Sequence, residues 1–206
     1  MKKATVAAGV AQCSDPKTSP QISASDGLTW YSPWNKPFRL EGLGWKHEGE
    51  IFRRMPLHSA WPLPEGVDYH AWQTPGVQAH FRTNSKRVFV RVKLRGLHSM
   101  HHMAPTGQCG FDAYIGEVGS MIYAGLARFL AAASEYESAV CNFPTATMRT
   151  VTINFPLREG VHEVAIGVDE GSRVVAAPAR ALRRPVIIYG TSITQGGCAS
   201  RPGMAY

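Results

Sequence analysis

Two runs of alternating apolar and polar residues constrain the fold most strongly. Val77, Ala79 and Phe81 alternate with Gln78, His80 and Arg82, and a second run has apolar residues at Val88, Val90, Val92 and Leu94. A period of two predicts strands with one buried face. Because Asn84 and Ser85 between the runs are turn formers, the sequence predicts that the two strands pair as a hairpin.

Further strands are predicted at Phe111–Ile115, Val151–Phe155 and Val164–Val168, whereas Tyr123–Ser134 is the only helix-like stretch. Many short strands separated by Gly and Pro turns favour a mainly β fold, a β-sandwich of jelly-roll or similar kind. The first 37 residues lack an apolar period and are rich in turn formers, so they are predicted to be a tail or linker before a sandwich over residues 38–177.

A different pattern begins at Pro185. Val186–Tyr189 is a continuous apolar run, which is typical of a parallel strand buried on both faces in an α/β sheet. We therefore predict that residues 178–206 begin a second domain, with Ala176–Arg180 as the linker. One strand without neighbours cannot be stable, so the segment after Pro185 is expected to fray or to pack opportunistically.

A turn of small residues, Gly190–Gly197, follows this run and holds one serine, Ser192, where the predicted strand ends. A tight turn there lets the hydroxyl project as a nucleophile while backbone N–H groups face a developing oxyanion. Gly190 would permit the bend, and Gly196 and Gly197 would let a substrate approach the backbone. The same pattern also fits a phosphate-binding loop or an ordinary strand-to-helix connection.

Composition excludes several other classes. The 206 residues are 44% hydrophobic and 18% charged, so the chain is expected to fold, and its net charge of +7 is scattered rather than gathered in one run. The four cysteines show no zinc-ligand spacing, and no apolar stretch is long enough to cross a membrane. Lys2 and Lys3 before Ala4–Ala11 imitate a signal peptide, but a retained tail is favoured; a secreted, periplasmic or cytoplasmic location stays open.

The segment Tyr189–Gly203 resembles the first conserved block of the SGNH, or GDSL-like, hydrolases, whose catalytic domain is a flavodoxin-like α/β fold. The resemblance implies that Ser192 is the nucleophile and that its backbone N–H is one oxyanion donor. Thr191 stands where the family's Gly-Asp-Ser-Leu form has Asp, which leaves the substrate open.

The upstream region resembles the N-terminal β-sandwich that one branch of these enzymes carries, named for a Gly-x-Asp-Leu-Tyr motif. The motif here is Gly110-Phe111-Asp112-Ala113-Tyr114, with Ala113 in place of Leu. Similar segments recur at Gly42–Trp45, Phe81–Thr83 and Ala104–Gly107, so the resemblance spans roughly Leu40 to Tyr206.

The family takes two further oxyanion donors and an Asp-x-x-His motif from later blocks. None of Asp15, Asp26, Asp68, Asp112 and Asp169 has a histidine three positions later. A nucleophile without a base loses most of its rate, so this polypeptide alone is expected to be essentially inactive.

Other candidates have plainer interpretations. His98, His101 and His102 lack a carboxylate or cysteine to complete a metal site, so no metal and no cofactor is expected. Asp112 and Tyr114 share one strand face and could contact a sugar, but a buried hydrogen-bonded pair is favoured. Trp45, Trp61 and Trp72 are more typical of core or edge residues than of a sugar platform, and Arg87, Arg91, Lys93 and Arg95 are more typical of a solvated face.

Three function classes remain. The first is the front part of a serine esterase that removes acyl groups, plausibly acetyl, from a small-molecule or carbohydrate ester. The second is a non-catalytic β-sandwich that binds carbohydrate or acts as an accessory module. A nucleic-acid-binding module, suggested only by charge, ranks last, and neither nucleic acid nor membrane is expected as a partner.

Overall fold

The computed structural model describes residues 27–45, 49–97, 100–180 and 186–205. The described residues form ten strands: β1 (Leu28–Tyr31), β2 (Arg39–Glu41), β3 (Gln78–Thr83), β4 (Arg87–Leu94), β5 (Asp112–Ile115), β6 (Ile122–Leu126), β7 (Glu135–Asn142), β8 (Arg149–Asn154), β9 (Val161–Asp169) and β10 (Val174–Val175). The helices are short: α1 (Glu65–His70), α2 (Pro105–Gln108) and the 3₁₀ turn η1 (Pro202–Met204).

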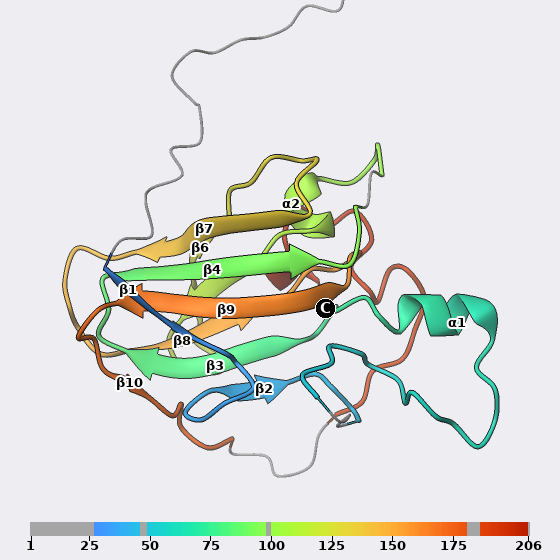
Figure 1. Cartoon of the computed structure of the whole chain (residues 1–206), viewed down its shortest axis with the longest axis horizontal. Helices are drawn as coiled ribbons and strands as arrows, with labels where there is room; N and C mark the ends of the chain where they lie inside the picture. Colours follow the sequence, from blue (N-terminus) through green and yellow to red (C-terminus); the bar gives the residue numbers. More distant parts are fainter. Residues whose placement is uncertain (1–26, 46–48, 98–99, 181–185, 206) are drawn as a thin grey trace, which may run out of the picture.

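The strands form two antiparallel sheets, which we call the first and second sheet (Figure 1). The first sheet has four strands in the order β1-β9-β4-β7. The second has six, in the order β10-β3-β8-β5-β6, with β2 paired to β3. The predicted mainly β sandwich is confirmed, whereas its assignment as a jelly roll stays a prediction.

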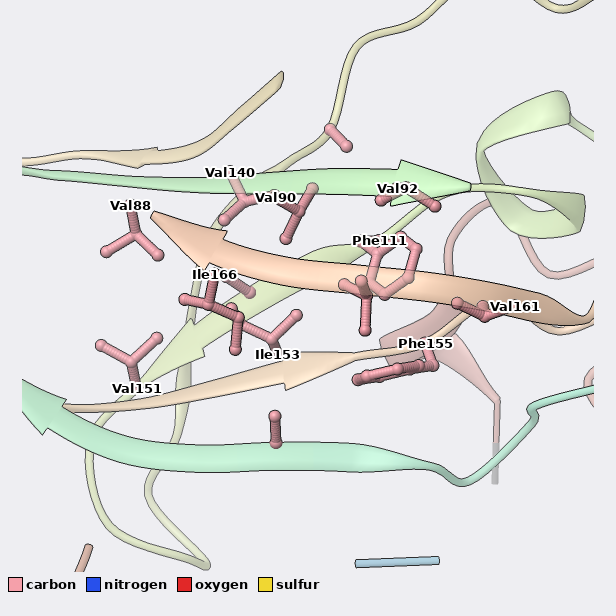
Figure 2. Packing of buried hydrophobic residues seen from close by; sticks show 14 of the residues in the cluster. Val88, Val90, Val92, Phe111, Val140, Val151, Ile153, Phe155, Val161 and Ile166 are labelled. Carbon is pink, nitrogen blue, oxygen red and sulfur yellow. The ribbon is translucent and has the colours of Figure 1, made fainter. Parts of the chain in front are cut away.

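The core lies between the sheets. Val88 and Val90 on β4 and Ile166 on β9 face Val151 and Ile153 on β8 in Figure 2, and all five are fully buried. The alternation seen in the sequence therefore marks the inward face of β4. Phe89, which alternation places on the opposite face, is also buried, because that face of the first sheet is partly covered.

Trp30 supplies part of this cover. Its ring lies over Gly167, where a Cβ would come within 2.9 Å of the indole, and the Arg91 guanidinium stacks on the same ring at 4.0 Å. The packed structure thus begins at β1, earlier than the sequence predicts from Phe38, because β1 pairs with β9 along its whole length.

Two predictions about local structure are wrong. The expected hairpin does not form, because β4 pairs with β7 and β9 in the first sheet while β3 pairs with β8 in the second. The expected helix at Tyr123–Ser134 is instead β6 and the loop after it, since Ile122–Leu126 finds hydrogen-bonding partners along β5.

The segment predicted as a linker is attached to the edge of the second sheet. Arg39 Nη1 donates to the carbonyl of Pro178 at 2.6 Å, and Arg180 Nη2 forms an ion pair with Glu41 Oε2 at 2.5 Å. The same Arg180 nitrogen lies 2.8 Å from Nε2 of the buried His80. These contacts hold Pro178 and Arg180, which follow the last strand, against β2 and β3.

The prediction of a buried strand at Val186–Tyr189 is wrong. These residues form no strand, and each is at least 66% exposed. A strand buried on both faces needs neighbours on either side, and the described part of the chain contains none for it. Of the two expected outcomes, the residues beyond it show opportunistic packing and not fraying, because the turn after Tyr189 packs against one end of the sandwich (Figure 1).

Candidate active site

Ser192 lies in an exposed turn that its own backbone stabilises. The N–H of Gln195 donates to the carbonyl of Thr191 at 3.1 Å, and the N–H of Gly197 donates to the carbonyl of Ser192 at 2.7 Å. Thr191 and Ser192 are both exposed. The serine side chain is therefore presented to solvent by a compact, hydrogen-bonded loop.

The two backbone groups of Ser192 differ. Its carbonyl also accepts from Arg158 Nη2 at 3.3 Å, so two donors hold it. Its N–H makes no hydrogen bond to any residue that the structure describes. An exposed N–H without a partner beside a serine hydroxyl is a group that can donate to an oxyanion.

The predicted glycines are required by close packing. A Cβ at Gly190 would overlap the Oγ1 of Thr194, so glycine allows the turn to close on itself. Gly196 has φ +91° and is buried, and a Cβ there would lie 2.6 Å from that of Ala205. Gly196 thus faces protein instead of an open path for substrate, whereas Gly197 remains exposed.

Side chains from the sandwich hold the turn, and sequence reasoning missed them. Gln195 Nε2 donates to the carbonyl of Leu157 at 2.9 Å and also to Oε1 of Gln73. The same Gln73 oxygen lies 3.0 Å from Nδ1 of His70, at the end of α1. Gln73 and Arg158 are isolated polar residues outside any motif, so only their side-chain contacts reveal them.

A second set of contacts holds the residues that follow the turn. Thr106 Oγ1, on α2, donates to the carbonyl of Ser200 at 2.6 Å. A Cβ at Gly107 would overlap the carbonyl of Ala199, so α2 and this segment touch through their backbones. The turn that carries Ser192 is therefore attached to the sandwich both by its own contacts and by contacts of the residues that follow it.

Asp112 is fully buried, and protein groups occupy its carboxylate. Asn154 Nδ2 donates to Oδ1 at 2.8 Å, and the N–H of Gly203 donates to Oδ2 at 2.9 Å. Burial raises the pKa of Asp112, while these two donors and the positive charge of Arg201 act in the opposite direction. The expected hydrogen bond between Asp112 and Tyr114 is not found among the described residues; the Tyr114 hydroxyl instead donates to the carbonyl of Gly203 at 3.2 Å. Both motif residues thus contact the C-terminal segment.

The remaining candidates do not gather around Ser192 through any contact described. His101 and His102 are exposed with ring centroids 5.0 Å apart, and His98 lies outside the described residues. Among the described residues, no group of three His, Cys, Asp or Glu side chains is arranged to hold a metal. Within the same ranges, no helix has the length and apolar character that a membrane crossing requires.

The tryptophans and the basic strand face differ in their surroundings. Trp72 lies between the guanidinium groups of Arg53 (4.8 Å) and Arg95 (3.8 Å), whereas Trp45 and Trp61 are exposed. On β4, three basic residues are paired with acids: Arg87 with Asp169, Arg91 with Glu137 and Lys93 with Glu135.

A two-sheet sandwich that carries a Gly-x-Ser turn on one end defines the class: a hydrolase-associated β-sandwich joined to a GDSL-like block. Residues 28–174 match the family model GxDLY, described as the N-terminus of the SGNH-hydrolase type of esterase. Because this match covers most of the chain, the protein belongs to that family. Residues 183–206 match a second model, the GDSL-like lipase/acylhydrolase family. The resemblance inferred from the sequence is thereby confirmed.

Solved structures show the same fold. A protein described as a GDSL-like lipase from Bacteroides ovatus superposes with a TM-score of 0.76 at 24% identity, over 86% of this chain and 51% of its own. The salicylyl-acyltransferase SsfX3 from a tetracycline biosynthetic pathway superposes with a TM-score of 0.55 at 18% identity, over 75% of this chain and 43% of its own. The chain thus spans about half the length of these relatives. No curated protein matches it significantly.

Proposed function

We propose that this chain is the sandwich and nucleophile-bearing part of a serine ester hydrolase, with Ser192 as the nucleophile. The observation that carries the proposal is the geometry of Ser192: an exposed residue on a braced turn, whose backbone N–H has no hydrogen-bond partner among the residues that the structure describes. Membership of a family described as the N-terminus of esterases supports the same reaction class. We further propose the division into an N-terminal tail, a sandwich that ends at residue 177 and the start of a hydrolase domain (178–206). Because β1 belongs to the first sheet, the proposed sandwich begins at Leu28 and not at residue 38.

In the proposed reaction, the Ser192 hydroxyl loses its proton to a base and attacks the carbonyl carbon of an ester. The N–H of Ser192 donates to the resulting oxyanion, and the alcohol then leaves with the proton from the base. Water hydrolyses the acyl-serine and regenerates the hydroxyl. Among the described residues, no histidine is hydrogen-bonded to Ser192. Since the similar structures are about twice as long, we propose that the base comes from a further region of the full-length protein.

For the substrate we propose a small acyl ester, acetyl in the first instance, on a carbohydrate or other small alcohol. Thr191 lies exposed next to Ser192 and its side chain is polar and uncharged. It therefore selects for neither acidic nor basic substrates. No cofactor takes part in the proposed chemistry.

The test is ester hydrolysis by the full-length natural protein with p-nitrophenyl acetate and an acetylated sugar as substrates. Ser192→Ala is expected to lower kcat by about a thousandfold or more, because the nucleophile is lost. Ser200→Ala is the matched control: it lies in the same exposed segment, and only its backbone carbonyl is used, by Thr106. Activity that survives Ser192→Ala would contradict the proposal.

The 206-residue chain by itself is expected to show no steady turnover. Turnover by this chain that Ser192→Ala abolishes would show that the base lies within it. A full-length protein that hydrolyses neither ester but retains soluble glycans would favour the accessory-module alternative.

A further inference from the structure

We propose that the Gly110–Tyr114 motif positions the nucleophile: Asp112 and Tyr114 fix the segment Arg201–Gly203, and through it the turn that carries Ser192. This inference rests on the proposed function for its catalytic consequence, but the mechanical part stands on contacts alone. It assigns a task to the motif for which the family is named.

Asp112 holds the segment Arg201–Gly203 through its carboxylate. Its Oδ2 accepts from the N–H of Gly203 at 2.9 Å and lies 3.4 Å from Nε of Arg201, while its Oδ1 accepts from Asn154 at 2.8 Å. Asn154 is itself held, because Gln78 Nε2 donates to its Oδ1 at 2.7 Å. A carboxylate that is fully buried and surrounded by donors is preorganised, and it leaves no free oxygen for a substrate.

Tyr114 holds the other side of Gly203. Its hydroxyl donates to the Gly203 carbonyl at 3.2 Å and lies 3.3 Å from Nη2 of Arg201. Both backbone polar groups of Gly203 are therefore hydrogen-bonded: its N–H to Asp112 and its carbonyl to Tyr114. A Cβ at position 203 would overlap the Tyr114 ring, so only glycine permits this approach.

Arg201 adds further contacts to those of Asp112 and Tyr114; we call the contacts among these three residues and Gly203 the clamp. Its guanidinium lies 4.3 Å from the ring centroid of Tyr123 on β6, and that ring packs edge-on against Tyr114 at 5.8 Å. The positive charge thus faces the buried carboxylate of Asp112 on one side and an aromatic face on the other. The charge of Arg201 acts against the effect of burial, which raises the pKa of Asp112.

The first motif residue serves the same contact. A Cβ at Gly110 would overlap the carbonyl of Thr106, so glycine lets α2 close against the start of β5. That closure places Thr106 where it donates to Ser200. The motif residues Gly110, Asp112 and Tyr114 therefore each contribute to holding residues 199–203, whereas Phe111 and Ala113, the latter at the motif's Leu position, belong to the buried core.

The path from the clamp to the nucleophile is short. Gly203 belongs to η1, after which the N–H of Ala205 donates to the carbonyl of Pro202 at 3.0 Å. Ala205 packs against Gly196, which lies within the turn of Ser192. The N–H of Ala199 donates to the carbonyl of Gly196 at 3.1 Å, so the turn rests on the clamped segment from two directions.

The mechanical part is tested by amide hydrogen exchange on the 206-residue chain, comparing Asp112→Asn and Tyr114→Phe with the unmodified protein. Exchange at Gly197, Ala199 and Gly203 is expected to accelerate about tenfold or more, because hydrogen bonds to a charged group are lost in the first variant and the Gly203 carbonyl contact in the second. Tyr114→Phe removes a single hydroxyl and keeps the ring, so it remains informative if Asp112→Asn fails to fold.

Asp169→Asn is the matched control. Asp169 also accepts several hydrogen bonds, from Ser85, Lys86 and Arg87, but it lies at the other end of β9 from the turn. Its loss is expected to lower overall stability without a selective effect on residues 197–203. Unchanged exchange in both clamp variants, or equal acceleration in Asp169→Asn, would overturn the proposal.

The catalytic part is tested separately in the full-length protein. Tyr114→Phe is expected to lower kcat for p-nitrophenyl acetate with little change in KM, because it displaces the nucleophile without touching the substrate. An unchanged kcat would overturn the catalytic part. Because hydrogen exchange needs no activity, its outcome holds even if the esterase proposal itself fails.

Discussion

His80 is a buried titratable residue that joins three segments. Its Nδ1 lies 2.9 Å from Thr152 Oγ1 on β8, and its Nε2 lies 3.1 Å from Glu41 Oε2 and 2.8 Å from Arg180. Burial lowers the pKa of His80 to about 4, and the charges of Arg180 and Arg39 add to this, although the Glu41 carboxylate acts in the opposite direction. His80 is thus neutral in the folded protein at neutral pH.

The sign of the pH dependence follows from this. Unfolded His80 binds a proton below its ordinary pKa of 6.5, whereas the folded form does so only near 4, so His80 lowers stability progressively across that window. At ~1.4 kcal/mol per pH unit, the loss reaches roughly 3 kcal/mol. The stability difference between the unmodified protein and His80→Gln, measured by urea denaturation, should shrink as pH falls from 6.5 to 4.

The control for this prediction is His162→Gln, which alters an exposed histidine on β9. The stability difference is expected to change more with pH for His80→Gln than for this variant, because only His80 is buried against Glu41 and Arg180. A difference for His80→Gln that stays constant from pH 6.5 to 4 would contradict the assigned protonation state.

At the level of single residues, the sequence predicts the nucleophile but not the groups that hold it. Ser192 belongs to a block with a recognisable order of small residues, which a resemblance can detect. Gln73 and Arg158 contact the turn only because β8, β9 and the end of α1 meet at one end of the sandwich. No local pattern encodes such a meeting.

At the level of elements, alternation predicts which faces are buried but not which strands pair. The inward residues of β4 are those the sequence indicates, yet β3 and β4 belong to different sheets. The pleat fixes the side of each residue, whereas pairing depends on the path of the whole chain. For the same reason β6 replaces the expected helix, since a sheet partner outweighs weak helix propensity.

The run Val186–Tyr189 gives a prediction about proteolysis. Tyr189 is 81% exposed and lies outside any strand, so brief chymotrypsin digestion should cut after it faster than after Tyr69, which is 57% exposed and lies within α1. Mass spectrometry of the products locates the cuts, and Tyr189→Thr should remove only this one. Faster cutting at buried Phe111 or Phe155 than at Tyr189 would contradict the described exposure.

At the level of the whole molecule, the net charge of +7 does not produce a free basic strand face, because acids neutralise Arg87, Arg91 and Lys93. We therefore expect no retention on immobilised oligonucleotides at about 0.15 M salt. Arg91→Glu, which reverses one of these charges, should leave the elution unchanged. Salt-dependent retention that this variant weakens would establish a nucleic-acid surface.

The contacts that mount the Ser192 turn on the sandwich have one common property. The atoms that they hold in the turn and in the segment after it are largely main-chain atoms: the carbonyls of Ser192 and Ser200 and both polar groups of Gly203. Every residue type carries such atoms. An outward side chain such as that of Thr191 can therefore be exchanged without loosening the turn, so the group beside Ser192 can vary while Ser192 stays in place.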